Sequence, residues 1–278
     1  MGRPEPPRRL IVNADDFGRS ASINEAVIRA HTEGILTTAS LMVNEPACAE
    51  AVALARQHPR LGVGLHLSLL CGRSALPPAQ IPGLVNERGE FSDKPVAVGF
   101  RYFFRRDVRS QLEAEIRAQL ERFRATGLVL DHVNGHLHMH LHPVVFRILM
   151  GCANEFGIRR MRLTRDPFWL DARLSPADRW FYRASHAFIY LCLSLRARGE
   201  FERRNIRRPR YVFGLLQNAR VNEAYLTRLL PMLPAGDSEL YSHPSLDEFK
   251  HEFDALVSPG AISLVRRLGI QLVRYQDL

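Results

Sequence analysis

Two adjacent carboxylates, Asp15 and Asp16, follow a short apolar run in the segment RLIVNADDFG. Neighbouring carboxylates repel each other unless a cation or a buried proton relieves the repulsion. Successive residues of a regular strand face opposite sides, so both reach one site only if the chain has turned, which Gly18 makes easier. The pair is therefore a candidate cation site at a strand end, and a solvated turn that caps the next helix is the alternative.

A histidine lies within a second apolar segment, GVGLHLSL. In an extended chain His66 shares one side with Gly64 and Ser68, while large aliphatic residues occupy the other side. A histidine on the small-residue side near a strand end can reach the mouth of a barrel. The alternative is a hydrogen-bonded histidine of the core.

Histidines are concentrated in the segment DHVNGHLHMHLHP, at positions His132, His136, His138, His140 and His142. Imidazole is a common ligand of first-row metals, and one carboxylate with two imidazoles leaves positions open for water and substrate. In an extended segment alternate histidines stand about 6 to 7 Å apart, so one ion cannot bind them all. We expect one of them to be a ligand and others to contact substrate or orient ligands; a helix-capping and surface run is the alternative.

Two further residues are candidates for the same site. His243, in ELYSHPS, follows the last clear strand and could act as an acid. Arg162, in MRLT, could pair with a site carboxylate or be a surface charge.

The elements that would position these residues alternate along the chain. Strands are expected at 9–13, 37–43, 62–69, 128–134, 158–164, 211–216 and 239–242, and helices at 46–57, 107–124, 143–156, 222–233 and 261–268. A first helix follows Ser22, which with Glu25 forms the pattern of a capping box. This alternation predicts an α/β fold of parallel units, in which ligands gather at the carboxyl ends of the strands.

Two segments depart from the alternation within a single expected domain, residues 1–278. Residues 71–98 are rich in proline and glycine and predict a long excursion that could cover a substrate. Residues 165–210 predict an insertion that is first apolar and aromatic and then carries seven arginines within fifteen residues. That composition would suit a helix on an anionic membrane surface, or an apolar helix covering the barrel followed by a basic loop.

Composition narrows the class of protein. The net charge is +9, yet the arginines are concentrated in the insertion without an aromatic stacking platform, so nucleic-acid binding is not expected. The four cysteines have no CxxC spacing and are expected to be reduced thiols. No apolar run is long enough to span a bilayer, and the opening segment lacks the features of a signal peptide, so we expect a cytoplasmic location.

The motifs LIVNADDFG, GLHLSL, HVNGHLHMHLHP and the late SHP resemble, in order and spacing, the YdjC-like carbohydrate deacetylases, the family of chito-oligosaccharide deacetylase. The segment PPAQIPGLVNERGEF and the insertion are similar to the hopanoid-biosynthesis-associated branch of that family. The resemblance covers nearly the whole chain. It implies a distorted (β/α) barrel of mainly parallel strands, like those of glycoside hydrolases and deacetylases.

The resemblance also implies roles for individual residues. Asp16, His66 and His136 would bind one divalent ion, Mg²⁺ or Zn²⁺. Asp15 would be the general base, His243 the acid that protonates the leaving amine, and Arg162 would orient Asp15. We expect substrate contacts from Asn134, His138 and His140.

The implied reaction is removal of an acetyl group from an N-acetylated amino sugar: N-acetylglucosaminyl hopanoid, a related glycolipid or a chito-oligosaccharide. The insertion is more basic and apolar than a soluble sugar requires, which favours a glycolipid and a peripheral contact of residues 180–210 with the inner membrane face. A metal-dependent phosphoester hydrolase and a non-enzymatic protein that binds nucleic acid or a membrane surface are the alternatives. A homodimer is left open.

Overall fold

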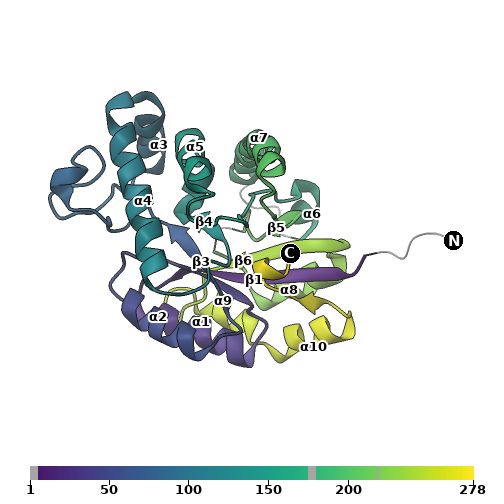
Figure 1. Ribbon diagram of the computed structural model, residues 1–278. Helices are drawn as coiled ribbons and strands as arrows, with labels where there is room; N and C mark the ends of the chain where they lie inside the picture. Colours follow the sequence, from purple (N-terminus) through teal and green to yellow (C-terminus); the bar gives the residue numbers. More distant parts are fainter. Residues whose placement is uncertain (1–5, 175–179, 218) are drawn as a thin grey trace.

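A parallel sheet forms the centre of the molecule in the computed structural model, which describes residues 6–174, 180–217 and 219–278 (Figure 1). Its strand order is β4-β3-β2-β1-β6-β5, and the short β7 pairs with the beginning of β1. The strands are β1 (Arg8–Phe17), β2 (Thr38–Leu41), β3 (Gly62–Leu67), β4 (Val133–Gly135), β5 (Tyr211–Phe213), β6 (Gly236–Ser242) and β7 (Gln271–Leu272). All pairs of these strands within the described residues are parallel, as the alternation predicts.

The segment expected as a strand at 158–164 closes the gap between the outer strands β4 and β5. The amide of Arg162 donates to Val133 of β4, at 3.1 Å. On the other side the amide of Met161 donates to Arg207, and that of Val212 to Arg165, both at 3.1 Å. The segment makes isolated bridges in place of a regular ladder, so the ring is a distorted barrel.

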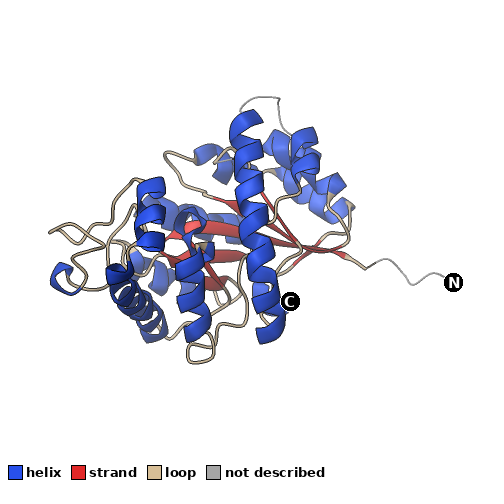
Figure 2. Ribbon diagram, turned by 90° about the horizontal axis from the view of Figure 1, so that it is seen from above, coloured by secondary structure: helices blue, strands red, loops and turns tan. Residues whose placement is uncertain are grey.

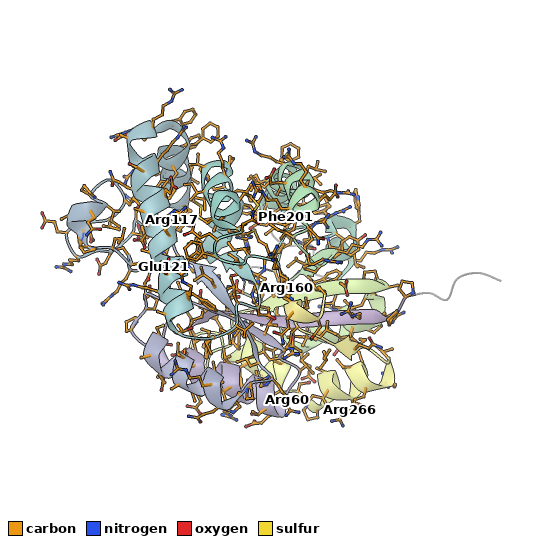
Figure 3. All side chains as sticks on the ribbon, viewed as in Figure 1. Arg60, Arg117, Glu121, Arg160, Phe201 and Arg266 are labelled. Atoms are coloured by element: carbon orange, nitrogen blue, oxygen red, sulfur yellow. The ribbon has the colours of Figure 1, made fainter. Side chains whose placement is uncertain are left out.

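Helices pack around the strands (Figures 1 and 2). In Figure 1, α3, α4, α5 and α7 stand above the sheet, while α1, α2, α9 and α10 lie below it. The helices are α1 (Ala21–Glu33), α2 (Cys48–Gln57), α3 (Pro95–Phe104), α4 (Arg109–Ala125), α5 (Pro143–Cys152), α6 (Phe168–Leu174), α7 (Trp180–Arg204), α8 (Glu223–Leu229), α9 (Lys250–Leu256) and α10 (Pro259–Arg267). Figure 3 shows Arg117 and Glu121 on α4.

The expected start of the first helix is wrong by two residues. Ser20, not Ser22, is the N-cap of α1, and its side chain accepts from the amide of Ile23. The hydroxyl of Ser22 instead accepts from the amide of Leu246, far along the chain. The hydroxyl of Ser22, which the sequence pattern predicts as a helix cap, is therefore used in a tertiary hydrogen bond.

The excursion at 71–98 is tied to the body of the protein. Two antiparallel bridges, Arg73 to Glu90 and Val85 to Phe91, connect its two arms. Glu115, buried on α4, accepts from the amides of Ala75 and Leu76, at 2.7 and 3.0 Å. The excursion is therefore held against α4; its role as a substrate cover stays a prediction.

The insertion at 165–210 contains α6 and α7. Residues 175–179 of this expected insertion, like residues 1–5 of the expected domain, lie outside the described residues. Within the described part of the chain, no helix combines the length and the apolar character needed to cross a bilayer.

Candidate metal centre

The end of β1 is bent at the two aspartates. The pairing of β1 with β2 changes register between Ala14 and Phe17, and Asp16 adopts a left-handed backbone with φ of 65°. Gly18 follows with φ of 92°. This turn breaks the strand alternation, so Asp15 and Asp16 are both buried at the carboxyl end of the sheet, as the sequence requires for a shared site.

Asp16, His66 and His136 come together from three segments. Oδ1 of Asp16 lies 3.3 Å from Nε2 of His66 and 3.1 Å from Nδ1 of His136. The two nitrogens are 3.4 Å apart. Ligand atoms about 2.0–2.1 Å from a tetrahedral ion are separated by about 3.3–3.4 Å, so these three atoms match one face of such a coordination shell. They form a buried group able to hold a metal ion.

The surroundings of His66 support that interpretation. Asn134 donates through Nδ2 to Asp15 and to Ser40, at 2.9 and 2.8 Å, which turns its Oδ1 towards Nδ1 of His66, at 2.7 Å. Because an amide oxygen only accepts, Nδ1 of His66 carries the proton of the neutral ring. The lone pair of Nε2 then faces the carboxylate of Asp16, an arrangement that a cation stabilises.

The pKa shifts of Asp16 and His136 also favour a positive charge within the triad. Burial opposes ionisation of Asp16, yet His136 and His66 outweigh it and hold the pKa of Asp16 well below its ordinary value. Burial likewise opposes protonation of His136, but Asp16 raises the pKa of His136 to about 10. The triad therefore attracts either a proton or a metal ion.

Asp15 belongs to a separate ion pair beside the triad. Arg162 donates to both of its oxygens, at 2.7 and 2.9 Å, and Asn13 and Asn134 donate to Oδ1. Burial opposes ionisation, but Arg162 outweighs it and holds the pKa of Asp15 well below its ordinary value. The sequence offered two interpretations of Arg162, and the structure shows the pairing with a site carboxylate.

Several residues of this network were not expected from the sequence. Glu239 of β6 accepts from Nε and Nη2 of Arg162, at 3.0 and 2.7 Å, and also accepts from the hydroxyl of Tyr275. Ser40 lies between Asn13, Asn134 and His132, all within hydrogen-bonding distance. In the sequence, the only indication of their role is that Ser40 and Glu239 are polar residues within otherwise apolar strands.

The histidine tract does not stay extended. After β4 it forms the 3₁₀ segment η3 (His136–Leu141), in which Leu137 and His138 have φ of 46° and 59°. These left-handed residues send successive histidines in different directions. Only His136 of this tract reaches the metal triad.

The remaining histidines of the tract have different surroundings. His140 contacts the carbonyl of Arg162 through Nε2, at 3.1 Å, and burial together with Arg162 lowers its pKa to about 3. The ring of His138 packs edge-on against Tyr190 and Tyr241. The Nδ1 atoms of both His138 and His140 are buried without a hydrogen-bond partner among the described residues. His142 caps α5 and contacts the carbonyl of Gly99.

His243 follows β6 at the same edge of the sheet. The register pairs Ala14 with Ser242, so Asp15 and His243 come next on adjacent strands. The His243 ring packs against Tyr241, with centroids 4.7 Å apart, and its Nδ1 is 3.8 Å from Oε2 of Glu252. The charge of His243 is among those that lower the pKa of Asp15.

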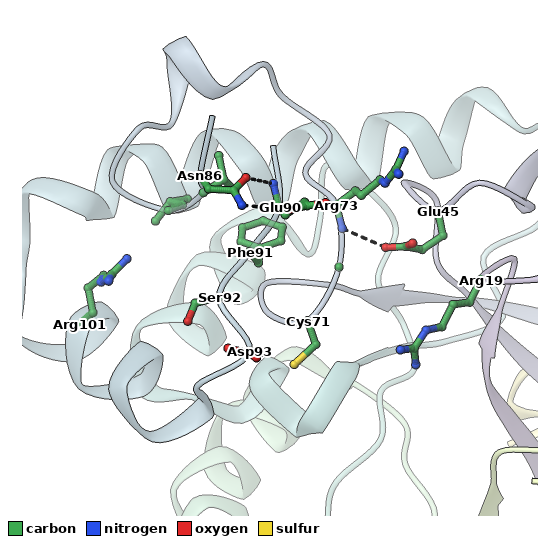
Figure 4. A pocket seen from close by; sticks show the side chains of 13 residues that line it. Arg19, Glu45, Cys71, Arg73, Asn86, Glu90, Phe91, Ser92, Asp93 and Arg101 are labelled. Carbon is green, nitrogen blue, oxygen red and sulfur yellow. Dashed lines mark hydrogen bonds between the residues drawn. The ribbon is translucent and has the colours of Figure 1, made fainter. Parts of the chain in front are cut away.

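Two residues that contact the triad also line a cleft of about 790 Å³, whose lining side chains are shown in Figure 4. Arg19 lines it and donates to Oδ2 of Asp16, at 3.0 Å, while Cys71, another lining residue, contacts His136. Its other lining groups include Arg73, Arg101, Glu45, Glu90, Asp93 and Phe91. The excursion at 71–98 therefore supplies much of a polar cleft that ends beside the candidate metal ligands.

Fold and site together define a parallel α/β barrel protein with a buried Asp-His-His group at the carboxyl ends of its strands. The chain belongs to the YdjC-like protein family, whose match covers residues 9–267.

Two related proteins are named carbohydrate deacetylases. The chain is 45% identical over 162 residues to a carbohydrate deacetylase of Geobacillus stearothermophilus, a match that covers 57% of this chain and 62% of that protein. It is 42% identical over 154 residues to a carbohydrate deacetylase of Brevibacillus brevis, covering 54% and 57%. The chain thus spans less than two thirds of the length of these curated relatives.

A solved structure has the same fold. The crystal structure of a candidate cellobiose-phosphate cleavage protein from Enterococcus faecalis superposes with a TM-score of 0.73 at 23% identity, covering 98% of each chain. This likeness supports the barrel assignment.

Proposed function

We propose that this protein is a metal-dependent hydrolase that removes the acetyl group from an N-acetylated amino sugar. The observation that carries the proposal is the convergence of Asp16, His66 and His136 beside the Asp15–Arg162 ion pair. The names of the relatives, which are carbohydrate deacetylases, support the reaction class.

The triad would hold one divalent ion, and its donor set of one carboxylate and two imidazoles suits Zn²⁺ while also admitting Mg²⁺. When bound, such an ion supplies Lewis acidity for the acetyl carbonyl and lowers the pKa of a water molecule. Asn134 would keep Nε2 of His66 free of a proton. Arg19 would occupy the second oxygen of Asp16, so that one oxygen remains for the ion.

Asp15 would accept the proton of the attacking water. Its carboxylate is held ionised and fixed by two contacts to Arg162, so Arg162 would act by positioning it. His243, on the neighbouring strand end, would donate a proton to the nitrogen of the leaving amine as the C–N bond breaks. The C–N bond that breaks would therefore lie between these two residues, with its nitrogen on the side of His243.

The cleft beside the triad would hold the sugar. Its charged and amide side chains suit the hydroxyl groups of a carbohydrate. The Nδ1 atoms of His138 and His140 have no hydrogen-bond partner among the described residues, but they are buried and do not line this cleft, so their predicted contact with substrate would need a local opening of the site. For Asn134 the geometry favours action through His66 and Asp15.

The finer proposal concerns the substrate. N-acetylglucosaminyl hopanoid or a related glycolipid would explain the apolar and basic insertion at 165–210, and a chito-oligosaccharide is the soluble candidate. A glycolipid substrate would place the enzyme at the inner face of the cytoplasmic membrane.

Acetate release tests the proposal. We expect the purified protein to release acetate from N-acetylglucosaminyl lipid or from chitobiose, to lose this activity in EDTA, and to regain it with Zn²⁺ or Mg²⁺. Asp16→Asn and His136→Gln should reduce kcat/KM by at least about a thousandfold, because each removes a ligand.

The matched control is His142→Gln, which changes a histidine of the same tract that lies outside the triad. Full activity of Asp16→Asn and His136→Gln would show that the ligand assignment is wrong. Release of phosphate from sugar phosphates without any acetate would replace the deacetylase by a phosphoester hydrolase.

A further inference from the structure

The solvent side of α7 is apolar from its beginning as far as Leu195 and basic from Arg196 to its end. Phe181, Phe188 and Leu195 are 89%, 67% and 63% exposed. Their spacing of seven residues places them on one side of the helix, and Ile189 and Leu191 are also exposed there. So many large apolar side chains on one helix exceed the scattered exposure usual for a protein surface.

Helix α3 carries a second group of the same character. Phe100 and Phe104 are 61% and 67% exposed, and their rings stack on each other with centroids 6.0 Å apart. Phe103 packs edge-on against Phe104 and is also exposed. Arg101 and Arg105 are also exposed, but Arg101 lines the cleft beside the triad and Arg105 pairs with Asp107, so the rings carry the argument here.

A basic groove lies between α5 and α7. Arg147 of α5 and Arg196, Arg203 and Arg204 of α7 line a cavity of about 460 Å³. Glu200 pairs with Arg203 and Arg204. Arg147 and Arg196 form no ion pair with a described residue, so the groove keeps an excess of positive charge suited to a phosphate group.

The three helices form one face of the molecule. Helix α5 contacts both α3 and α7, and the three stand side by side above the sheet in Figure 1. Helix α7 also packs on η3, the segment that carries His136. The face therefore borders the candidate metal centre.

We propose that this face, formed by α3, α5 and α7, docks on the surface of an anionic membrane. The exposed rings would enter the region of the lipid headgroups, and the arginine-lined groove would bind a lipid phosphate. Vesicle binding needs no catalytic turnover, so this inference stands or fails independently of the deacetylase reaction.

Charge favours a membrane over a second copy of the chain as the occupant. A twofold dimer through this face would bring the same arginines of both copies together, and like charges across an interface oppose association. An anionic bilayer instead offers opposite charge to the arginines and an apolar layer to the rings.

Vesicle flotation tests the proposal. At low salt we expect the protein to float with vesicles of phosphatidylcholine and phosphatidylglycerol, and to float much less with phosphatidylcholine alone or in high salt. Arg196→Glu with Arg203→Glu should lower the partition coefficient at least about tenfold, and Phe181→Ser with Phe188→Ser should lower it several-fold. Unchanged thermal unfolding would show that these variants fold.

Matched controls lie elsewhere on the molecule. Arg266→Glu with Arg267→Glu makes the same charge change on α10, on the lower side in Figure 3, and Val129→Ser removes another exposed apolar group. Both controls should bind like the unaltered protein. Failure to float with anionic vesicles, an equal loss in the controls, or a dimer dispersed by the α7 variants without vesicle binding would each overturn the proposal.

Discussion

Arg162 joins Asp15 to Glu239 at the centre of the barrel. Its guanidinium group contacts both oxygens of Asp15 and one oxygen of Glu239, with no exposure to solvent. Counted formally, Asp15, Asp16 and Glu239 contribute three negative charges, against two positive charges from Arg162 and Arg19. The remaining negative charge lies beside the two imidazoles of the triad, where a divalent cation would balance it.

Loss of Arg162 should therefore change both stability and pH dependence. Arg162→Gln leaves two buried carboxylates without their partner, and we expect the free energy of unfolding to fall by about 3–5 kcal/mol. The pKa of Asp15 should rise, which moves the acidic limb of the kcat/KM profile to higher pH. Arg160→Gln, two residues away on the same segment, is the control; an unmoved acidic limb would remove Arg162 from the positioning of Asp15.

Asn134 should control metal affinity without contacting the ion. Asn134→Leu removes the acceptor that fixes the His66 ring, and we expect Zn²⁺ binding measured by calorimetry to weaken about 10–100-fold. Asn86→Leu, in the wall of the cleft, should bind Zn²⁺ normally. Equal affinities of Asn134→Leu and the unaltered protein would contradict the orienting role.

His140 should make the protein sensitive to moderate acid. Its folded-state pKa, about 3, lies below the value of about 6.5 expected in the unfolded chain. The unfolded state therefore binds a proton first, and the stability contributed by the neutral ring is lost as pH falls from about 6.5 towards 3, by up to about 1.4 kcal/mol per pH unit. In urea unfolding, His140→Gln should lose less stability between pH 7 and 4.5; parallel curves over that range would exclude His140 as the cause.

Gly64 should tolerate no side chain. A Cβ there would lie 2.5 Å from the carbonyl oxygen of His132 and 2.6 Å from its ring. We expect Gly64→Ala to lower the free energy of unfolding by about 1–3 kcal/mol because His132 and the Ser40 contact must shift. Gly151→Ala on α5, where a Cβ meets nothing within 4 Å, should instead be neutral or stabilising.

The convergence of Asp16, His66 and His136 could be predicted because each follows or ends a recognisable strand. That these residues bind an ion stays a prediction. The directions of His138 and His140 could not be predicted, since they depend on two left-handed residues, Leu137 and His138, that no local pattern requires. The roles of Ser40 and Glu239 could not be predicted from the sequence either, because these residues meet Asn134 and Arg162 only in the folded barrel.

The irregular closure of the barrel brings the two ends of the insertion close together. The chain leaves the ring near Arg165 and returns near Arg207, and hydrogen bonds join these two points: Met161 to Arg207 and Val212 to Arg165. The insertion at 165–210 thus begins and ends at neighbouring points, which hydrogen bonds of the barrel hold together. Helix α7 of this insertion also packs on η3 and buries Phe201 in the core, so a change in the insertion would reach the histidine segment as well as the surface.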